Sequence, residues 1–144
     1  MAVTTAAKKL SRPFRILLIE DNPADVYLLE MALKRRKINY KLLYYAYGEQ
    51  AIRALQKGDC LKPDLILADL NLPRRDGFDV LTAVRGKPSL VGVRVGILTS
   101  SDARKDRHRI LLLGAQRYIK TPSTLEDFLE HVGGTIQELL TRDQ

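Results

Sequence analysis

The sequence predicts an α/β protein with a doubly wound, five-stranded parallel sheet and helices on both of its faces. Five short apolar runs alternate along the chain with segments whose apolar residues recur at helical spacing. Several of these runs end in acidic or hydroxyl-bearing side chains, which is where open parallel sheets carry their chemistry. The chain has 144 residues, 45% of them hydrophobic and 28% charged, which is the size and composition of one folded domain.

The expected elements follow from apolar periodicity and from cap residues. Strands are expected at residues 15–21, 41–47, 63–69, 94–100 and 116–120. Asn22 and Pro23 start the first helix, because Asn caps a helix and Pro fits its first position. Further helices are expected after Gly48, at 78–85, from Asp102 or a neighbouring serine to Leu113, and from a capping box at Ser123–Glu126 to about Leu140.

Right-handed crossovers between parallel strands leave few topologies, and the flavodoxin-like order 2-1-3-4-5 is the natural one. Residues 1–13 are expected to form a flexible tail, and residues 14–144 the domain.

Composition excludes several classes of protein. No apolar run approaches the roughly 20 residues that cross a bilayer, so no membrane partner is expected. One cysteine, Cys60, cannot form an internal disulfide, which suits the cytoplasm. The formal charge of +7 would attract anions. The basic residues are scattered, however, and no DNA-reading motif accompanies them, so direct DNA binding is not expected.

The candidate site lies where the expected strands end. Glu20 and Asp21 end the first strand, Asp69 the third, Thr99 the fourth, and Lys120 with Thr121 the fifth. The carboxyl ends of parallel strands meet at one edge, so these residues are expected to share one site.

Clustered carboxylates repel one another unless a cation lies among them. A set of oxygen ligands suits Mg²⁺. Asp21 and Asp69 could each supply one oxygen, the backbone carbonyl of Asn71 a third, and Glu20 could bind through water. Asp69 could also attack a phosphoryl group and form an acyl phosphate, whose oxygens the Thr99 hydroxyl would contact. For Asp69 alone, a carboxylate that only caps a loop is the competing interpretation.

Four segments together resemble the response-regulator receiver domain: Ile19-Glu-Asp-Asn-Pro-Ala-Asp25, Leu67-Ala-Asp-Leu-Asn-Leu-Pro73 with Asp76-Gly77, Ile97-Leu-Thr-Ser-Ser101, and Gly114-Ala-Gln-Arg-Tyr-Ile119. Within that family, the chain is similar to the stand-alone regulators of phytochrome-type histidine kinases.

The resemblance implies a phosphoryl-accepting switch. A sensor histidine kinase would transfer its phosphoryl group to Asp69 with Mg²⁺ bound by Glu20, Asp21, Asp69 and Asn71. Thr99 would then turn toward the phosphoryl group and Tyr118 would move inward. The face formed by the fourth helix, the fifth strand and the fifth helix would change, and a partner or a second copy would bind it. Such a protein is not an enzyme, beyond the slow hydrolysis of its own acyl phosphate.

One departure from the family is visible. The family usually reads Tyr-x-Thr-Lys-Pro where this chain reads Tyr118-Ile-Lys-Thr-Pro122. The shift by one residue turns Lys120 to the opposite face of its strand unless a bulge restores it. The resemblance leaves the isomer of the Thr121–Pro122 bond open, because the matching bond is often cis in the family.

Two alternatives stay open. The first is a pseudo-receiver that binds or dimerises independently of phosphorylation. The second is a phosphatase that uses Asp69 as its nucleophile, although Asn71 stands where such an enzyme would carry a second acid.

Overall fold

The computed structural model describes residues 12–58, 62–100 and 103–141. Its strands are β1 (Phe14–Ile19), β2 (Tyr40–Tyr45), β3 (Leu65–Asp69), β4 (Arg94–Thr99) and β5 (Arg117–Lys120). Its α-helices are α2 (Pro23–Arg35), α3 (Gly48–Lys57), α4 (Gly77–Arg85), α5 (Arg104–Leu112) and α6 (Leu125–Thr141), and a 3₁₀ turn, η1, spans Pro88–Leu90. Each helix follows a strand, as the alternating pattern predicts.

Within the described residues the strands form one five-stranded parallel sheet in the order β2-β1-β3-β4-β5. The predicted fold class and strand order are therefore confirmed. The pairing of Ile19 with Ala68 and of Asp69 with Leu98 brings the ends of β1, β3 and β4 to the same edge of the sheet.

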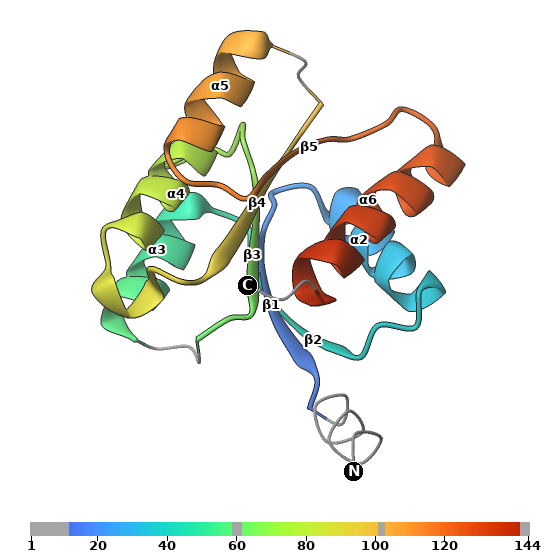
Figure 1. Cartoon of the computed structure of the whole chain (residues 1–144), viewed down its shortest axis with the longest axis horizontal. Coiled ribbons are helices and arrows are strands. Elements are labelled where there is room, and N and C mark those ends of the chain that lie inside the picture. The colour runs from blue at the N-terminus through green and yellow to red at the C-terminus, as the bar shows by residue number, and fades with distance from the viewer. Residues whose placement is uncertain (1–11, 59–61, 101–102, 142–144) are drawn as a thin grey trace.

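Two apolar layers hold the helices to the sheet. In Figure 1, α3, α4 and α5 cover one face of the sheet while α2 and α6 cover the other. Each face has its own core: Leu17, Ile66 and Ile97 point toward the first group of helices. Ile16, Leu67 and Leu98 point toward the second. Alternate residues of each buried strand thus serve opposite cores, which is why the strands read as continuous apolar runs.

Helix boundaries differ from the prediction where the cap residue was misassigned. Asn22 caps α2 as predicted, with its side chain accepting from the backbone N–H of Ala24. The residue before α5 is Ala103, which supplies no side-chain cap, and Asp102 lies outside the described residues. Thr124 rather than Ser123 caps α6, because its hydroxyl accepts from the backbone N–H of Asp127 at 3.3 Å.

The remaining expectations concern parts of the chain away from the helix caps. No peptide bond between described residues is cis, so the Thr121–Pro122 bond, whose isomer the sequence left open, is trans. Most of the expected N-terminal tail lies outside the described residues, but Arg12 forms an ion pair with Asp64 at 3.0 Å. Cys60 also lies outside the described residues. In the described part of the chain no helix combines the length and hydrophobicity that a membrane crossing needs.

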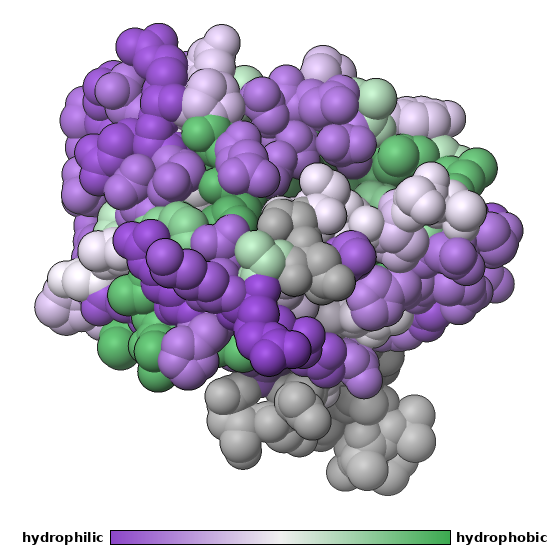
Figure 2. Space-filling model, turned by 90° about the horizontal axis from the view of Figure 1, so that it is seen from above, coloured by the Kyte–Doolittle hydropathy of each residue, from purple (hydrophilic) through white to green (hydrophobic). Residues whose placement is uncertain are grey.

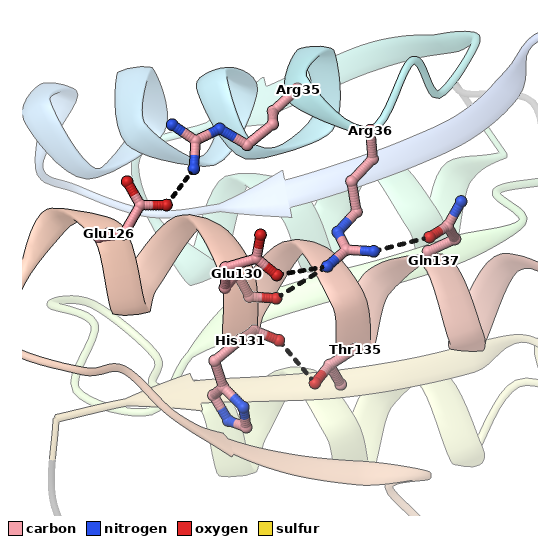
Figure 3. Close-up of polar contacts among 7 residues, drawn as sticks. All are labelled: Arg35, Arg36, Glu126, Glu130, His131, Thr135 and Gln137. Carbon is pink, nitrogen blue, oxygen red and sulfur yellow. Dashed lines mark hydrogen bonds and ion pairs between the residues drawn. The ribbon is translucent and has the colours of Figure 1, made fainter.

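The basic end of α2 joins that helix to α6 (Figure 3). Arg36 donates to Gln137 Oε1 at 3.0 Å and to both the carbonyl and the carboxylate of Glu130, at 3.3 and 3.0 Å. Its guanidinium lies against Gly133 and Gly134, where a Cβ atom would come within 3.2–3.3 Å of it. The two glycines, a weakness in an isolated helix, give Arg36 room to pack and leave α6 continuous.

Candidate functional site

Three carboxylates meet at the carboxyl edge of the sheet. Glu20 and Asp21 follow β1, and Asp69 ends the neighbouring strand β3. One oxygen of each side chain lies within 4.8 Å of an oxygen of the other two. Glu20 is only 5% exposed, Asp69 is half-buried and Asp21 is exposed. We call this set the acidic trio; the structure brings together the three acids that the sequence singled out.

Backbone groups fix two members of the acidic trio. The N–H of Asn22 donates to Glu20 Oε2 at 3.2 Å, and the N–H of Asn71 donates to Asp69 Oδ1 at 3.2 Å. Both donors stand two residues after the acid that accepts, at the start of the loop that leaves the strand. The backbone turn that follows each strand therefore also orients the carboxylate.

Burial and neighbouring negative charges destabilise the charged forms of Glu20 and Asp69. Burial, followed by the charge of Asp69, raises the pKa of Glu20 to about 8. Burial also raises the pKa of Asp69; the charge of Asp21 acts in the same direction and the N–H of Asn71 in the opposite one. The site therefore favours a proton or a cation among the carboxylates.

A cavity of about 660 Å³ opens beside the acidic trio. Its polar lining includes Glu20, Asp69, Asn71, Thr99 and Thr121, and its apolar lining comes from the α2 and α6 side of the sheet. Figure 2 looks onto this edge of the molecule and shows hydrophobic residues between the hydrophilic ones. The lining of the cavity is therefore partly acidic and partly apolar.

The end of β5 places Lys120 and Thr121 differently. Thr121 lines the cavity, and its N–H donates to the carbonyl of Thr99 at 2.8 Å. Lys120 pairs with Thr99 in the sheet register, is exposed, and is not among the described residues that line the cavity. Tyr118 is half-buried and packs against the core on the α3–α4–α5 face, with the Arg107 guanidinium 6.0 Å from the centre of its ring.

The loop between β3 and α4 is held by contacts that the sequence analysis missed. A Cβ atom on Gly48, the first residue of α3, would lie 1.9 Å from the carbonyl oxygen of Arg75. The N–H of Glu49 donates to the carbonyl of Arg74 at 2.9 Å. Arg74 and Arg75 both have positive φ, 52° and 80°. The available signal was the glycine that begins a helix immediately after a strand.

Asp25, in the first turn of α2, is a second residue to which the sequence analysis gave no role. It lines the cavity, and its charge contributes to the raised pKa of both Glu20 and Asp69. Its position in the first turn of α2, which directly follows the strand end that carries Glu20 and Asp21, could have indicated this.

The acidic trio fits a hard divalent cation. Its donors are oxygens alone, they lie close enough to share one ion, and burial together with the neighbouring negative charges raises the pKa of Glu20 and of Asp69. Asn71, two residues after Asp69, lines the same cavity.

Comparisons with known proteins agree with this geometry. The family model of the response regulator receiver domain matches residues 16–133. Response regulator Rcp1 of Synechocystis sp. is 34% identical over 126 residues, which cover 85% of this chain and 86% of Rcp1.

Two solved structures share the fold. One is the phosphorylated cyanobacterial phytochrome response regulator RcpA, with a TM-score of 0.85 and 29% identity over 92% of this chain and 98% of that one. The other is the Mn²⁺-bound form of Rcp1, with a TM-score of 0.83 and 32% identity over the same shares. With its sheet order, its acidic trio and these matches, the chain belongs to the response regulator receiver domain family of two-component signalling proteins.

Proposed function

We propose that this protein is a single-domain response regulator that accepts a phosphoryl group from a sensor histidine kinase onto Asp69. One observation carries the proposal: the Asp69 carboxylate ends β3 within 4.8 Å of Glu20 and Asp21, on a cavity that Thr99 also lines. Among these acids, Asp69 stands on the central strand of the sheet and lines the cavity, where a phosphoryl donor can reach it.

The proposed reaction is a direct transfer of the phosphoryl group from the kinase phosphohistidine to Asp69, with no other reactant. An oxygen of Asp69 forms a bond to phosphorus while the phosphorus–nitrogen bond of the kinase phosphohistidine breaks, and the electron pair of that bond returns to the imidazole. Asp21, Asp69 and the carbonyl of Asn71 would hold Mg²⁺, with Glu20 acting through a water molecule. The metal, when bound, neutralises charge on the transferred group. Water later hydrolyses the acyl phosphate slowly and regenerates Asp69.

Thr99 and Thr121 are the proposed contacts of the phosphoryl oxygens. Both line the cavity, and the hydrogen bond between their backbones ties the end of β5 to the end of β4. Lys120, predicted as a third contact, is exposed and off the described lining, so we assign the contact at this strand end to Thr121.

The proposed output surface is the face of α5, β5 and α6. When Thr99 moves toward the phosphoryl group, Tyr118 is expected to follow, because the two residues stand on neighbouring strands and point to the same side of the sheet. Leu111 and Leu112 of α5 are 44% and 73% exposed. An apolar pair on this face suits a partner or a second copy of the chain, and we propose a homodimer.

The proposed kinase is of the phytochrome type, in the cytoplasm. RcpA is described as a phytochrome response regulator and shares 29% of its residues with this chain over nearly its whole length.

The phosphorylation is tested by intact-protein mass spectrometry after incubation with acetyl phosphate and Mg²⁺. We expect the mass of one phosphoryl group on the wild-type protein and none on Asp69→Asn. Asp106→Asn, an acid in the first turn of α5, is the matched control and should be labelled like the wild type. No label on the wild type, or equal label on Asp69→Asn, would refute the assignment.

The alternative is a pseudo-receiver that acts without phosphorylation, and one observation favours it: Thr121 stands where the family usually has lysine. It predicts the same oligomeric state and the same partner affinity with and without acetyl phosphate. Sedimentation analysis of the labelled and unlabelled protein separates the two functions, because a switch requires the two states to differ.

A further inference from the structure

The cavity beside Asp69 carries negative charge that nothing on its described lining offsets. Its acids are Glu20, Asp25 and Asp69, and no lysine, arginine or histidine is among the described residues that line it. The protein as a whole has a formal charge of +7. An acidic hollow in a basic protein is a local feature, and it selects cationic ligands.

The acidic trio uses only part of this space. A divalent cation with a few waters needs on the order of 100 Å³, since one water occupies about 30 Å³ of liquid volume. The cavity measures about 660 Å³ and extends along Leu18, Leu29, Leu98 and Phe128, on the α2 and α6 side of the sheet. It can therefore take an apolar stem in addition to an ion.

A second group of polar atoms lies outside the acidic trio. Asp25 lies in the first turn of α2, and Thr121, Ser123 and Thr124 lie between β5 and α6; all four line the cavity. Among the described residues no basic side chain forms an ion pair with Asp25. One carboxylate with three hydroxyls provides acceptors for an ammonium or a guanidinium group. We call this set the Asp25 subsite.

We infer that the Asp25 subsite binds a lysine or arginine side chain of a partner protein, with its methylene stem against the apolar wall of the cavity. A basic side chain has both required parts, an apolar stem and a charged end. The inference rests on the proposed function for its consequence. Phosphorylation replaces the single negative charge of the Asp69 carboxylate with nearly two on the phosphoryl group, a net gain of about one negative charge next to the Asp25 subsite, so it strengthens the binding of the partner. The partner's basic side chain then supplies, near Thr121, the positive charge that lysine usually supplies at this position in the family.

The test uses n-butylammonium as the probe, because it has the stem and the charge of lysine, and n-butanol as its neutral counterpart. Binding is followed by the shifts of backbone amide signals in NMR spectra of the full chain with saturating Mg²⁺. We expect n-butylammonium to shift the amides around Asp25 and Thr121, and to bind at least about fivefold more tightly than n-butanol. Beryllofluoride, a mimic of the phosphoryl group, should tighten n-butylammonium further.

Variants separate the Asp25 subsite from general attraction. Asp25→Asn should weaken n-butylammonium at least about fivefold, Thr121→Lys should abolish its binding by supplying a cation, and Asp106→Asn should leave it unchanged. Equal binding of n-butanol, or an unchanged affinity in Asp25→Asn, would overturn the inference. Since this measurement involves no phosphoryl transfer, its failure leaves the phosphorylation of Asp69 intact, and failed phosphorylation would not remove the binding.

Discussion

Replacing Asp69 with asparagine should stabilise the metal-free protein. The acids of the trio have oxygens within 4.8 Å of one another, and two unit charges at that distance repel by about 3.5 kcal/mol at an effective dielectric constant near 20. The exposure of Asp21 to water and a proton on Glu20 both reduce this repulsion. We therefore expect Asp69→Asn to raise the free energy of unfolding by about 1–3 kcal/mol in EDTA.

The gain should grow with pH. The pKa of Glu20 is about 8 in the folded protein, above its ordinary value of 4.5. A carboxyl group whose pKa is raised by folding stabilises the fold below its unfolded value, and this contribution is lost as the pH rises toward the folded value. At pH 6 most Glu20 side chains hold a proton that relieves the repulsion from Asp69. At pH 9 they do not, so Asp69→Asn should exceed the wild type by more at pH 9 than at pH 6.

Mg²⁺ should make the wild type more stable than Asp69→Asn. A ligand that binds only the folded state at 100 times its dissociation constant stabilises it by about 2.7 kcal/mol. The wild type should gain this stability, and Asp69→Asn, without one of the acidic ligands, should gain much less. Urea denaturation at pH 6 and at pH 9, each with EDTA and with Mg²⁺, gives the free energy of unfolding of the wild type and of Asp69→Asn under these four conditions. Asp106→Asn serves as the control outside the site. A variant less stable than the wild type in EDTA at pH 9, or an equal gain from Mg²⁺, would refute the electrostatic argument.

Three further predictions concern the structure around the site. Arg36→Gln should lower the free energy of unfolding by about 2 kcal/mol, because it loses charge-assisted hydrogen bonds to α6. Arg35→Gln loses one exposed ion pair and should lower it by less than about 1 kcal/mol in the same urea titration. Gly48→Ala should lower the free energy of unfolding by more than about 2 kcal/mol, because the new Cβ would lie 1.9 Å from the carbonyl oxygen of Arg75. Gly92→Ala, with open space around its Cβ, should change the free energy of unfolding by less than about 0.5 kcal/mol. Burial raises the pKa of Asp64, but the hydrogen bonds from Arg12 and from the backbone of Arg15 outweigh it and hold that pKa below its ordinary value. Asp64→Asn should therefore destabilise the protein at pH 7, and by progressively less as the pH falls below about 4. Thermal unfolding of both proteins between pH 7 and pH 3 would detect this shrinking difference.

The sequence predicted the sheet and the acidic trio because both depend on short-range patterns. Buried parallel strands are continuous apolar runs, and topology brings the residues that follow them to one edge. Glu20, Asp21 and Asp69 could therefore be grouped although about fifty residues separate them. The strand bounds were less predictable: β1 ends at Ile19 rather than at Asp21, since polar side chains at the end of a run do not show where pairing stops.

The contacts that the sequence did not predict join distant elements. Nothing local to Gly48 indicates that the carbonyl of Arg75 lies against it, and nothing local to Arg36 indicates that Gly133 and Gly134 make room for its guanidinium. The cap of α6 was wrong by one residue because Ser123 and Thr124 can both cap, and the competition is decided by which of them reaches a free N–H. Such choices depend on the three-dimensional path of the chain.

The position of Thr121 joins the two proposals in this chain. A cation supplied by the chain itself would offset the charge of a phosphorylated Asp69 at all times, and the offset would be independent of any partner. With a hydroxyl at that strand end and Asp25 across the same cavity, the phosphorylated site keeps an excess of negative charge. A basic side chain of a partner can then make the electrostatic interaction that a lysine at position 121 would otherwise make within the chain. Because the phosphoryl charge strengthens this interaction, such a partner binds the phosphorylated protein more tightly than the unphosphorylated one. Thr121→Lys is therefore the informative variant: it should stabilise the phosphorylated protein on its own while weakening the dependence of partner binding on phosphorylation.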